Sequence, residues 1–158
     1  MRVISFLLLF IVSFTVFAQE EESDLQIKNI SIGLRVGNPS GITFKKYFSD
    51  HALELNIGST VGKNGGLSVF LHYLLHNAIT TIGETDDIEG FSWYYGAGGQ
   101  FKGSGNNTDF GIDGVIGLEY KVPEYPVRLF IDIIMNLEIV DDPFDIDLDG
   151  GIGGRYTF

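Results

Sequence analysis

The sequence predicts an all-β protein, an antiparallel up-and-down transmembrane β-barrel of about eight strands. Three observations lead to this prediction. Apolar and polar residues alternate with a period of two through most of the chain after residue 19. Turn-forming residues separate the alternating segments at regular intervals. The less apolar face of these segments is rich in glycine and carries acids and bases together, which suits the narrow interior of a small barrel.

Residues 1–18 are predicted to be a secretory signal peptide rather than part of the fold. A basic start precedes an apolar run from Val3 to Phe17, and Ala18 stands where a signal peptidase reads. An uncleaved membrane anchor is the alternative, but the run is shorter than the roughly 20 residues that a spanning helix needs. Residues 19–158 would then form a single barrel domain. The chain has no cysteine after the apolar run, which excludes a lipid-anchored lipoprotein.

The strands are assigned from the alternation itself. In the first, Ile30, Ile32 and Leu34 share one face while Ser31 lies on the other. Later segments repeat this pattern, least cleanly in the fourth, and a polar, acidic stretch at 77–90 is predicted to be a longer connection. The eight predicted strands are 28–36, 42–48, 52–58, 67–75, 91–102, 110–122, 127–139 and 144–158.

Alternation alone does not separate a membrane barrel from a soluble sandwich or a lipocalin-like barrel, because all of them have one apolar face. The aromatic residues favour the membrane barrel. If the chain enters and leaves on the periplasmic side, aromatic side chains gather near the strand ends on that side, as in an interfacial girdle. They are Phe48, Tyr73, Phe91, Trp93, Tyr120, Tyr125, Tyr156 and Phe158. We therefore expect the apolar faces, with Ile30, Leu55, Leu118 and Ile133 among them, to contact lipid.

The charged residues of the other face are predicted to point into the lumen and to form a network there. An eight-stranded barrel leaves an interior just wide enough to be filled by side chains. An unpaired charge in that space is costly, so opposite charges should pair into a plug, with a narrow, ion-gated pore as the alternative. The predicted lumen charge network consists of Arg35, Lys45, Glu54, Asp113, Glu119, Lys121, Arg128, Asp132 and Arg155.

Four segments resemble those of small outer-membrane β-barrel proteins common in Bacteroidota. They are GNPSGITFK at 37–45, WYYGAGG at 93–99, GLEYK at 117–121 and RYTF at 155–158. The resemblance covers nearly all of residues 19–158, and its motifs are structural rather than catalytic. It implies a monomer in the bacterial outer membrane, surrounded by outer-membrane lipid. Tyr156 and Phe158 resemble the terminal-strand signal of such barrels, which implies insertion by the barrel-assembly machinery.

An acidic run near the end of the chain matches the opening of an EF-hand calcium loop. Asp145, Asp147, Asp149 and Gly150 have the required spacing. The twelfth position of such a loop should be a bidentate glutamate, but here it is Tyr156. The run is therefore interpreted as the inward face of a strand. We expect neither a metal site nor a cofactor.

The three histidines provide no clear catalytic group. His72-Tyr73 is similar to part of the active site of outer-membrane lipid A deacylases, but Leu74 stands where their serine is expected. Nucleophilic catalysis needs a nucleophile beside a base and a third orienting group, and none can be assembled around His51, His72 or His76. His72 is interpreted as a wall or interfacial residue, and His76 is expected to lie past its strand end. No catalytic residue is predicted.

The charge and the glycine clusters argue against two further classes of ligand. The formal charge of −11 argues against nucleic acid as a partner, because binding it requires a basic surface. The glycine clusters 96–99 and 150–154 lie in strands without a following helix and so do not predict dinucleotide binding. Three function classes remain: a structural or interaction protein of the cell envelope, a small channel, and a lipid-modifying enzyme. The first is preferred, because no catalytic group can be assembled, and within it the short loops argue against adhesion through a large receptor surface.

Overall fold

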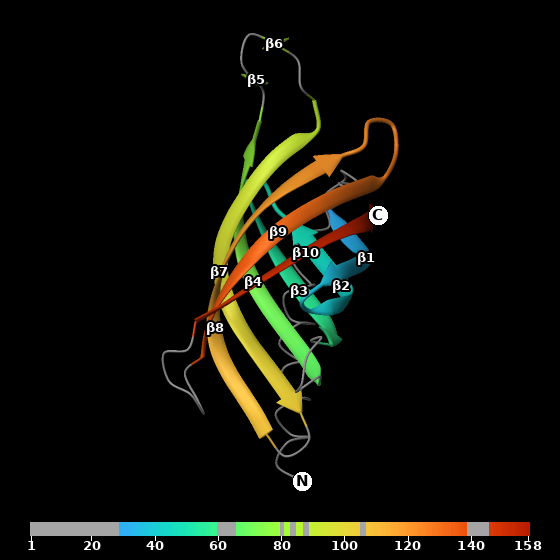
Figure 1. Ribbon diagram of the computed structural model, residues 1–158. Coiled ribbons are helices and arrows are strands. Elements are labelled where there is room, and N and C mark those ends of the chain that lie inside the picture. The colour runs from blue at the N-terminus through green and yellow to red at the C-terminus, as the bar shows by residue number, and fades with distance from the viewer. Residues whose placement is uncertain are drawn as a thin grey trace.

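The described part of the chain forms a closed antiparallel β-barrel, as predicted (Figure 1). The computed structural model describes residues 29–59, 66–79, 81–82, 85–86, 89–104, 107–138 and 146–158. The barrel strands are β1 (Ile30–Gly37), β2 (Ser40–Tyr47), β3 (His51–Ser59), β4 (Leu67–Ala78), β7 (Phe91–Ser104), β8 (Asn107–Lys121), β9 (Val127–Glu138) and β10 (Ile146–Thr157). Among the described residues, no helix is long and apolar enough to cross a membrane.

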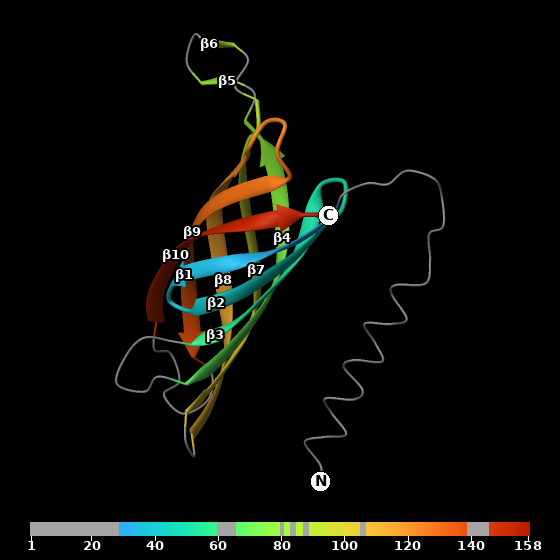
Figure 2. The same cartoon turned by 90° about the vertical axis from the view of Figure 1, so that its right-hand side faces the viewer.

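The barrel closes by pairing its first strand with its last. Ile32 lies opposite Tyr156 in the β1–β10 ladder, and the Phe158 N–H donates to the Ile30 carbonyl at 2.8 Å. Every other barrel strand pairs with its neighbours in chain order, so the order is β1-β10-β9-β8-β7-β4-β3-β2. The strands run steeply tilted around the wall (Figure 2). Closure leaves no open sheet edge in the barrel, a condition for a sheet that crosses a bilayer.

The two ends of the barrel differ in what they carry. We call the end that holds Phe158 and the turns 48–50 and 122–126 the terminal rim, and the other end the opposite rim. Two short strands, β5 (Thr81–Ile82) and β6 (Thr85–Asp86), pair with each other in the connection between β4 and β7 and stand beyond the terminal rim (Figures 1 and 2). They do not join the barrel sheet.

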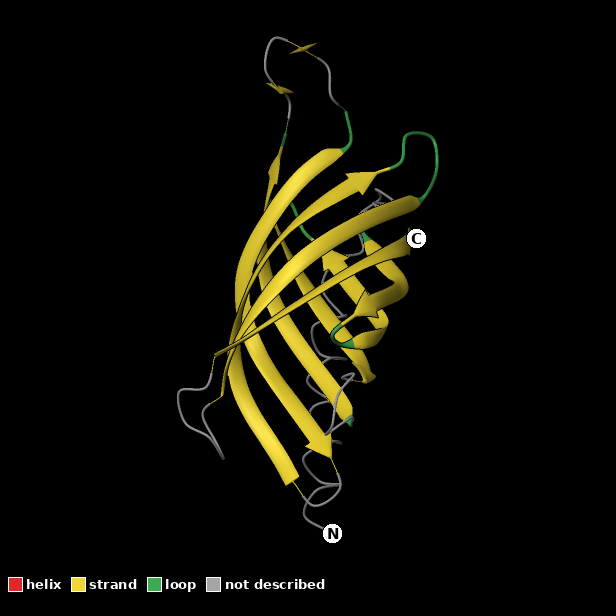
Figure 3. Cartoon of the chain, in the orientation of Figure 1, coloured by secondary structure: helices red, strands yellow, loops and turns green. Residues whose placement is uncertain are grey.

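Side chains alternate across the wall with the polarity of a membrane barrel rather than of a soluble one. On β1, Leu34 is 66% exposed while its neighbour Arg35 is 2% exposed. On β9, Ile133 is 55% exposed while Asp132 is 3% exposed. Charged residues therefore point inward and aliphatic residues outward, because adjacent residues of a strand face opposite sides. Figure 3 shows strands throughout the wall, joined by loops and turns at the rims.

Most predicted strands are confirmed, with shifted ends. The connection predicted at 77–90 was wrong at its start, because Asn77 and Ala78 pair with Trp93 and Ser92 and so extend β4. The rest of the segment is a connection between barrel strands, as predicted, and the short strands β5 and β6 lie within it. Pairing with a neighbouring strand can hold polar residues extended even where their own pattern is weak. The predicted signal peptide 1–18 and the start of the last predicted strand, 144–145, lie outside the described residues.

Candidate functional site: the charged interior

Five inward-facing residues form the central charge cluster, namely Lys45, Glu54, Glu119, Arg128 and Arg155. Lys45 and Glu54 are direct partners in the β2–β3 ladder, and their Nζ and Oε2 atoms are 3.4 Å apart. Lys45 Nζ also lies 3.2 Å from Glu119 Oε2, although 74 residues separate the two in the sequence. Tilted strands bring side chains from opposite walls together in a lumen this narrow.

Arg155 connects the two acids from the other side of the lumen. Its Nη2 donates to Glu54 Oε2 at 2.7 Å, and its Nη1 lies 3.4 Å from Glu119 Oε2. Arg128 lies at the terminal rim, where its side chain is 20% exposed. Its Nη1 donates to Glu119 Oε1 over 2.9 Å. The cluster therefore holds three cations and two carboxylates. Only Arg128 of the five reaches solvent.

Neutral and aromatic residues complete the cluster. The Tyr47 hydroxyl donates to Glu119 at 2.7 Å, the Arg155 Nε donates to Thr43 at 3.0 Å, and the Asn56 amide donates to Glu54 at 2.9 Å. The Arg155 guanidinium also lies 3.7 Å from the centre of the Phe130 ring. These contacts replace part of the hydration that buried charges lose, which decides whether such a network is tolerated.

A second buried pair lies beside this cluster. Arg35 Nη2 donates to Asp132 Oδ1 at 2.5 Å, and its Nη1 donates to the Pro39 carbonyl at 2.7 Å. The Tyr94 hydroxyl donates to Asp132 Oδ2 at 3.3 Å. The guanidinium occupies the space left by Gly151, where an added Cβ would fall on it.

A third pair, His72 and Asp113, is also enclosed within the wall. His72 Nε2 lies 3.1 Å from Asp113 Oδ1, although the angles fall outside those of a hydrogen bond. His72 was predicted as a wall or interfacial residue that faces inward from its strand, and the structure directs it into the interior beside the ring of Phe70. Nearer the opposite rim, Asp149 accepts from Asn38 at 2.6 Å and from Asn136 at 2.5 Å.

Eight of the nine residues predicted for the lumen network lie in these three groups. Lys121 is the exception, and its prediction was wrong. It is the last residue of β8, opposite Arg128 in the ladder, and its side chain is exposed at the terminal rim. It forms no ion pair with any residue of the described ranges. The alternation predicts on which face of a strand a residue lies, but not whether the barrel wall continues far enough beyond that residue to enclose its side chain.

Sequence reasoning missed the neutral partners of the network. Thr43, Tyr47, Asn56 and Tyr94 all occupy inward positions of predicted strands. The alternation could have identified them as lumen residues. Thr43, Tyr47 and Asn56 each lie two residues from a predicted charged residue of the same strand, and Tyr94 faces the same lumen from another strand. They carry no charge, whereas the predicted network consists of charged residues alone.

The other two histidines and the acidic run near the end of the chain form no metal site in the described residues. His76 was expected past its strand end, but it lies within β4, half-buried between the rings of Tyr47 and Tyr94. His51 lies at the terminal rim, and its 2.8 Å hydrogen bond with Asp50 lowers the pKa of that carboxyl. In the described part of the chain, no three His, Cys, Asp or Glu side chains are grouped to hold a metal ion. Asp145 of the acidic run lies outside that part.

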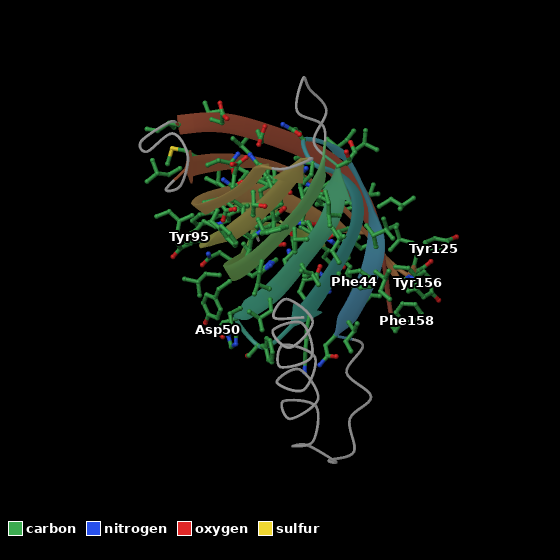
Figure 4. The ribbon with its side chains drawn as sticks, turned by 90° about the horizontal axis from the view of Figure 1, so that it is seen from below. Phe44, Asp50, Tyr95, Tyr125, Tyr156 and Phe158 are labelled. Atoms are coloured by element: carbon green, nitrogen blue, oxygen red, sulfur yellow. The ribbon has the colours of Figure 1, made fainter. Side chains whose placement is uncertain are left out.

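Exposed aromatic side chains gather at the terminal rim. The rings of Phe91 and Tyr120 are 4.4 Å apart, and those of Tyr156 and Phe158 are 4.9 Å apart. Figure 4 shows Tyr125, Tyr156 and Phe158 together on the outside of the wall. Aromatic rings at this level are typical of the border between lipid and water.

Comparison with known proteins shows the fold and no family. No protein-family model matches the chain. No curated protein matches its sequence. Among solved structures, the N-terminal β-barrel domain of Pseudomonas aeruginosa OprF is similar, with 16% sequence identity and a TM-score of 0.61. The similarity covers 82% of this chain and 96% of that domain, so the two share the architecture of a small closed barrel.

Proposed function

We propose that this chain is an integral outer-membrane β-barrel with a side-chain-filled lumen and a structural or interaction role in the cell envelope. In this proposal residues 1–18 direct export and are removed, and Tyr156 and Phe158 serve as the insertion signal for the barrel-assembly machinery. Support for a membrane location comes from the apolar outer surface of the closed barrel and from the aromatic residues at the terminal rim.

The central charge cluster is the observation that carries the closed-lumen proposal. Lys45, Glu54, Glu119 and Arg155 reach one another across the lumen, and each is no more than 1% exposed. An ion crossing the barrel would have to separate these pairs, and separating buried pairs costs several kcal/mol, of order 3–5 for the loss of one partner. The protein is therefore expected to conduct no ions at rest.

A narrow channel is the alternative, and it requires the cluster to rearrange. A lipid-modifying enzyme is less well supported. His72 and Asp113 are 0% and 4% exposed inside the barrel, where a membrane lipid has no access to them. We expect no catalytic activity, and an unchanged lipid A mass after overexpression would agree with this expectation.

Two measurements test the proposal. The protein from the outer-membrane fraction should change its mobility on a detergent gel after boiling, because a folded membrane barrel resists the detergent until it is heated. Purified protein in a planar bilayer should then give no reproducible conductance steps. A soluble protein without a mobility change would contradict the membrane location, and regular steps from the folded protein would contradict the closed lumen.

A double variant makes the second test sharper. Lys45→Ala with Glu119→Ala removes one charge of each sign from the cluster and should produce small steps where the unmodified protein gives none. Lys46→Ala is the matched control, because Lys46 is the next residue of β2 and lies on the outer face beside the Phe48 ring. Silence from a folded double variant would show that other side chains close the lumen.

A further inference from the structure

The terminal rim carries a pocket that borders the central charge cluster and shares Arg128 with it. It has a volume of about 260 Å³ and is lined by the turn between β8 and β9 together with the end of β10, including Lys121, Glu124, Tyr125, Arg128 and Thr157. This volume is just below the range of about 300–1,000 Å³ of pockets that hold drug-sized ligands. The pocket is therefore of a size for a single polar headgroup.

The pocket is held in shape by backbone hydrogen bonds. The Val122 N–H donates to the Val127 carbonyl at 2.9 Å and closes the base of the turn. The Thr157 N–H donates to the Pro126 carbonyl at 2.8 Å and ties the turn to β10. Because the backbone of the turn is fixed in this way, a ligand would meet a cavity that is already formed.

The charges that face this pocket have both signs, and two of the three, Lys121 and Glu124, form no ion pair in the described part of the chain. Lys121 and Glu124 are exposed, and neither forms an ion pair or side-chain hydrogen bond with another residue of the described ranges. Arg128 Nη1 donates to Glu119, and the Arg128 side chain, which is 20% exposed, also lines the pocket. Two cations and one carboxylate around one cavity match a ligand that carries a phosphate and an ammonium group.

Glu124 occupies its position against a backbone preference. Its φ is 64°, and it follows Pro123 in a turn closed by the Tyr125 N–H on the Val122 carbonyl at 3.3 Å. Type II turns have this conformation at their third residue and favour glycine there. A glutamate at a glycine position places a carboxylate on the pocket at some cost in backbone energy.

The level of the pocket on the barrel indicates where its ligand resides. Tyr125, Tyr156 and Phe158 are exposed beside it on the outer wall (Figure 4). Such rings lie at the depth of the lipid headgroups. Below them the exposed side chain of Leu129 continues the apolar outer face along which acyl chains would run.

We infer that this pocket binds the headgroup of a phosphoethanolamine phospholipid, with the phosphate at Lys121 and Arg128 and the ammonium at Glu124. The inference rests on the proposed membrane location and goes beyond it by naming a lipid class and a site. A choline headgroup has no N–H to donate to Glu124, and a glycerol headgroup has no positive charge. The pocket should therefore distinguish these three lipids.

The test measures lipid binding to delipidated, folded protein in detergent. Native mass spectrometry would follow titrations with phosphatidylethanolamine, phosphatidylcholine and phosphatidylglycerol. We expect phosphatidylethanolamine to bind about fivefold more tightly than the other two, the effect of one exposed charge contact. Glu124→Gln should remove this preference, whereas Lys121→Gln should weaken the binding of all three lipids and keep the preference, because each of them carries the phosphate. Lys46→Gln, at the same rim but outside the pocket, should keep the preference.

Each alternative result overturns the inference. Equal binding of the three lipids, or an equal loss in Lys46→Gln, would mean that the pocket selects no headgroup. Tighter binding of phosphatidylglycerol, strengthened by Glu124→Gln, would identify a site for anions alone. The mobility change on boiling is recorded for every variant. If it persists while selectivity is absent, the pocket assignment fails and the membrane location stands, whereas its loss from the unmodified protein would remove both.

Discussion

At the scale of single residues, the interior is organised by pairing large side chains with glycines. An added Cβ at Gly98 would fall on the His72 ring, and one at Gly151 would fall on the Arg35 guanidinium. The lumen of a small barrel has too little volume for a side chain at every inward position. Glycine at these positions lets long polar residues reach the partners that neutralise them.

Gly151 provides the clearest test of this packing. Gly151→Ala should displace Arg35 from Asp132 and lower the free energy of unfolding by about 1–3 kcal/mol, the usual cost of overpacking. Gly150→Ala is the matched control, because Gly150 is exposed and its added Cβ would lie at an ordinary 3.4 Å from the Asp132 carbonyl. Urea titration of protein folded in lipid vesicles measures both. Equal losses would show that glycine is needed here for the backbone alone.

The pairing of Arg155 can be tested in the same way. Arg155→Gln leaves Glu54 and Glu119 with Lys45 as their only fully buried cation in the described structure and should cost about 3–5 kcal/mol of unfolding free energy. The double variant Arg155→Gln with Glu54→Gln removes both partners of the 2.7 Å contact and should cost less than the single change. A double variant that is less stable than the single one would contradict the ion-pair account.

At the scale of the strands, the same alternation that buries charge exposes aliphatic residues on the outer face of the barrel. Ile133 lies in the middle of β9, whereas Ile30 begins β1 at the terminal rim. Ile133→Arg should therefore lower the unfolding free energy by about 2–4 kcal/mol in lipid vesicles, and Ile30→Arg by about 0–1 kcal/mol. Similar small losses at both positions would show that the outer face does not lie in a bilayer.

The turn between β8 and β9 contains Glu124, whose positive φ can be tested by substitution. Glu124→Gly should raise the unfolding free energy by about 1 kcal/mol, because glycine adopts the positive φ without the penalty that other residues incur. Glu124→Ala removes the carboxylate but keeps the penalty, so it should leave stability close to that of the unmodified protein. Urea titration of the two variants separates backbone from side chain. A destabilised Glu124→Gly would mean that the carboxylate stabilises the turn.

At the scale of the whole molecule, closure of the barrel gives the two rims different surroundings. The terminal rim carries the aromatic residues and the pocket that we propose binds a lipid headgroup, here called the headgroup pocket, and we expect this rim to face the periplasm. The chain contains no cysteine, so single cysteines report their side of the membrane without background. Ser49 lies exposed in a turn of the terminal rim, and Thr108 lies exposed near the opposite rim.

Labelling of intact cells tests this orientation. A membrane-impermeant maleimide should react with Thr108→Cys in intact cells and with Ser49→Cys only after the outer membrane is made permeable. Reaction in cell lysates confirms that both cysteines are accessible. The reverse pattern would mean that the barrel is inserted with its termini outside, and the headgroup pocket would then face the outer leaflet.

The sequence by itself determined the face of each strand residue. Ile32, Lys45 and Asp132 lie on the faces that period-two alternation predicted, because adjacent side chains of any extended strand point to opposite sides. The sequence also determined that the barrel is narrow, since a strand face that combines charged residues with glycines suits a narrow enclosed interior. These are local properties, and they need no knowledge of which strands are neighbours.

Only the tertiary structure decided which charges meet and which leave the lumen. Arg155 reaches Glu54 across 101 residues, and Lys121 lies outside at the rim although its alternation matches that of Glu119. Both outcomes depend on the register and tilt with which β1 and β10 close the barrel. Closure is a property of all the strands together, and for that reason no single segment of the sequence encodes it.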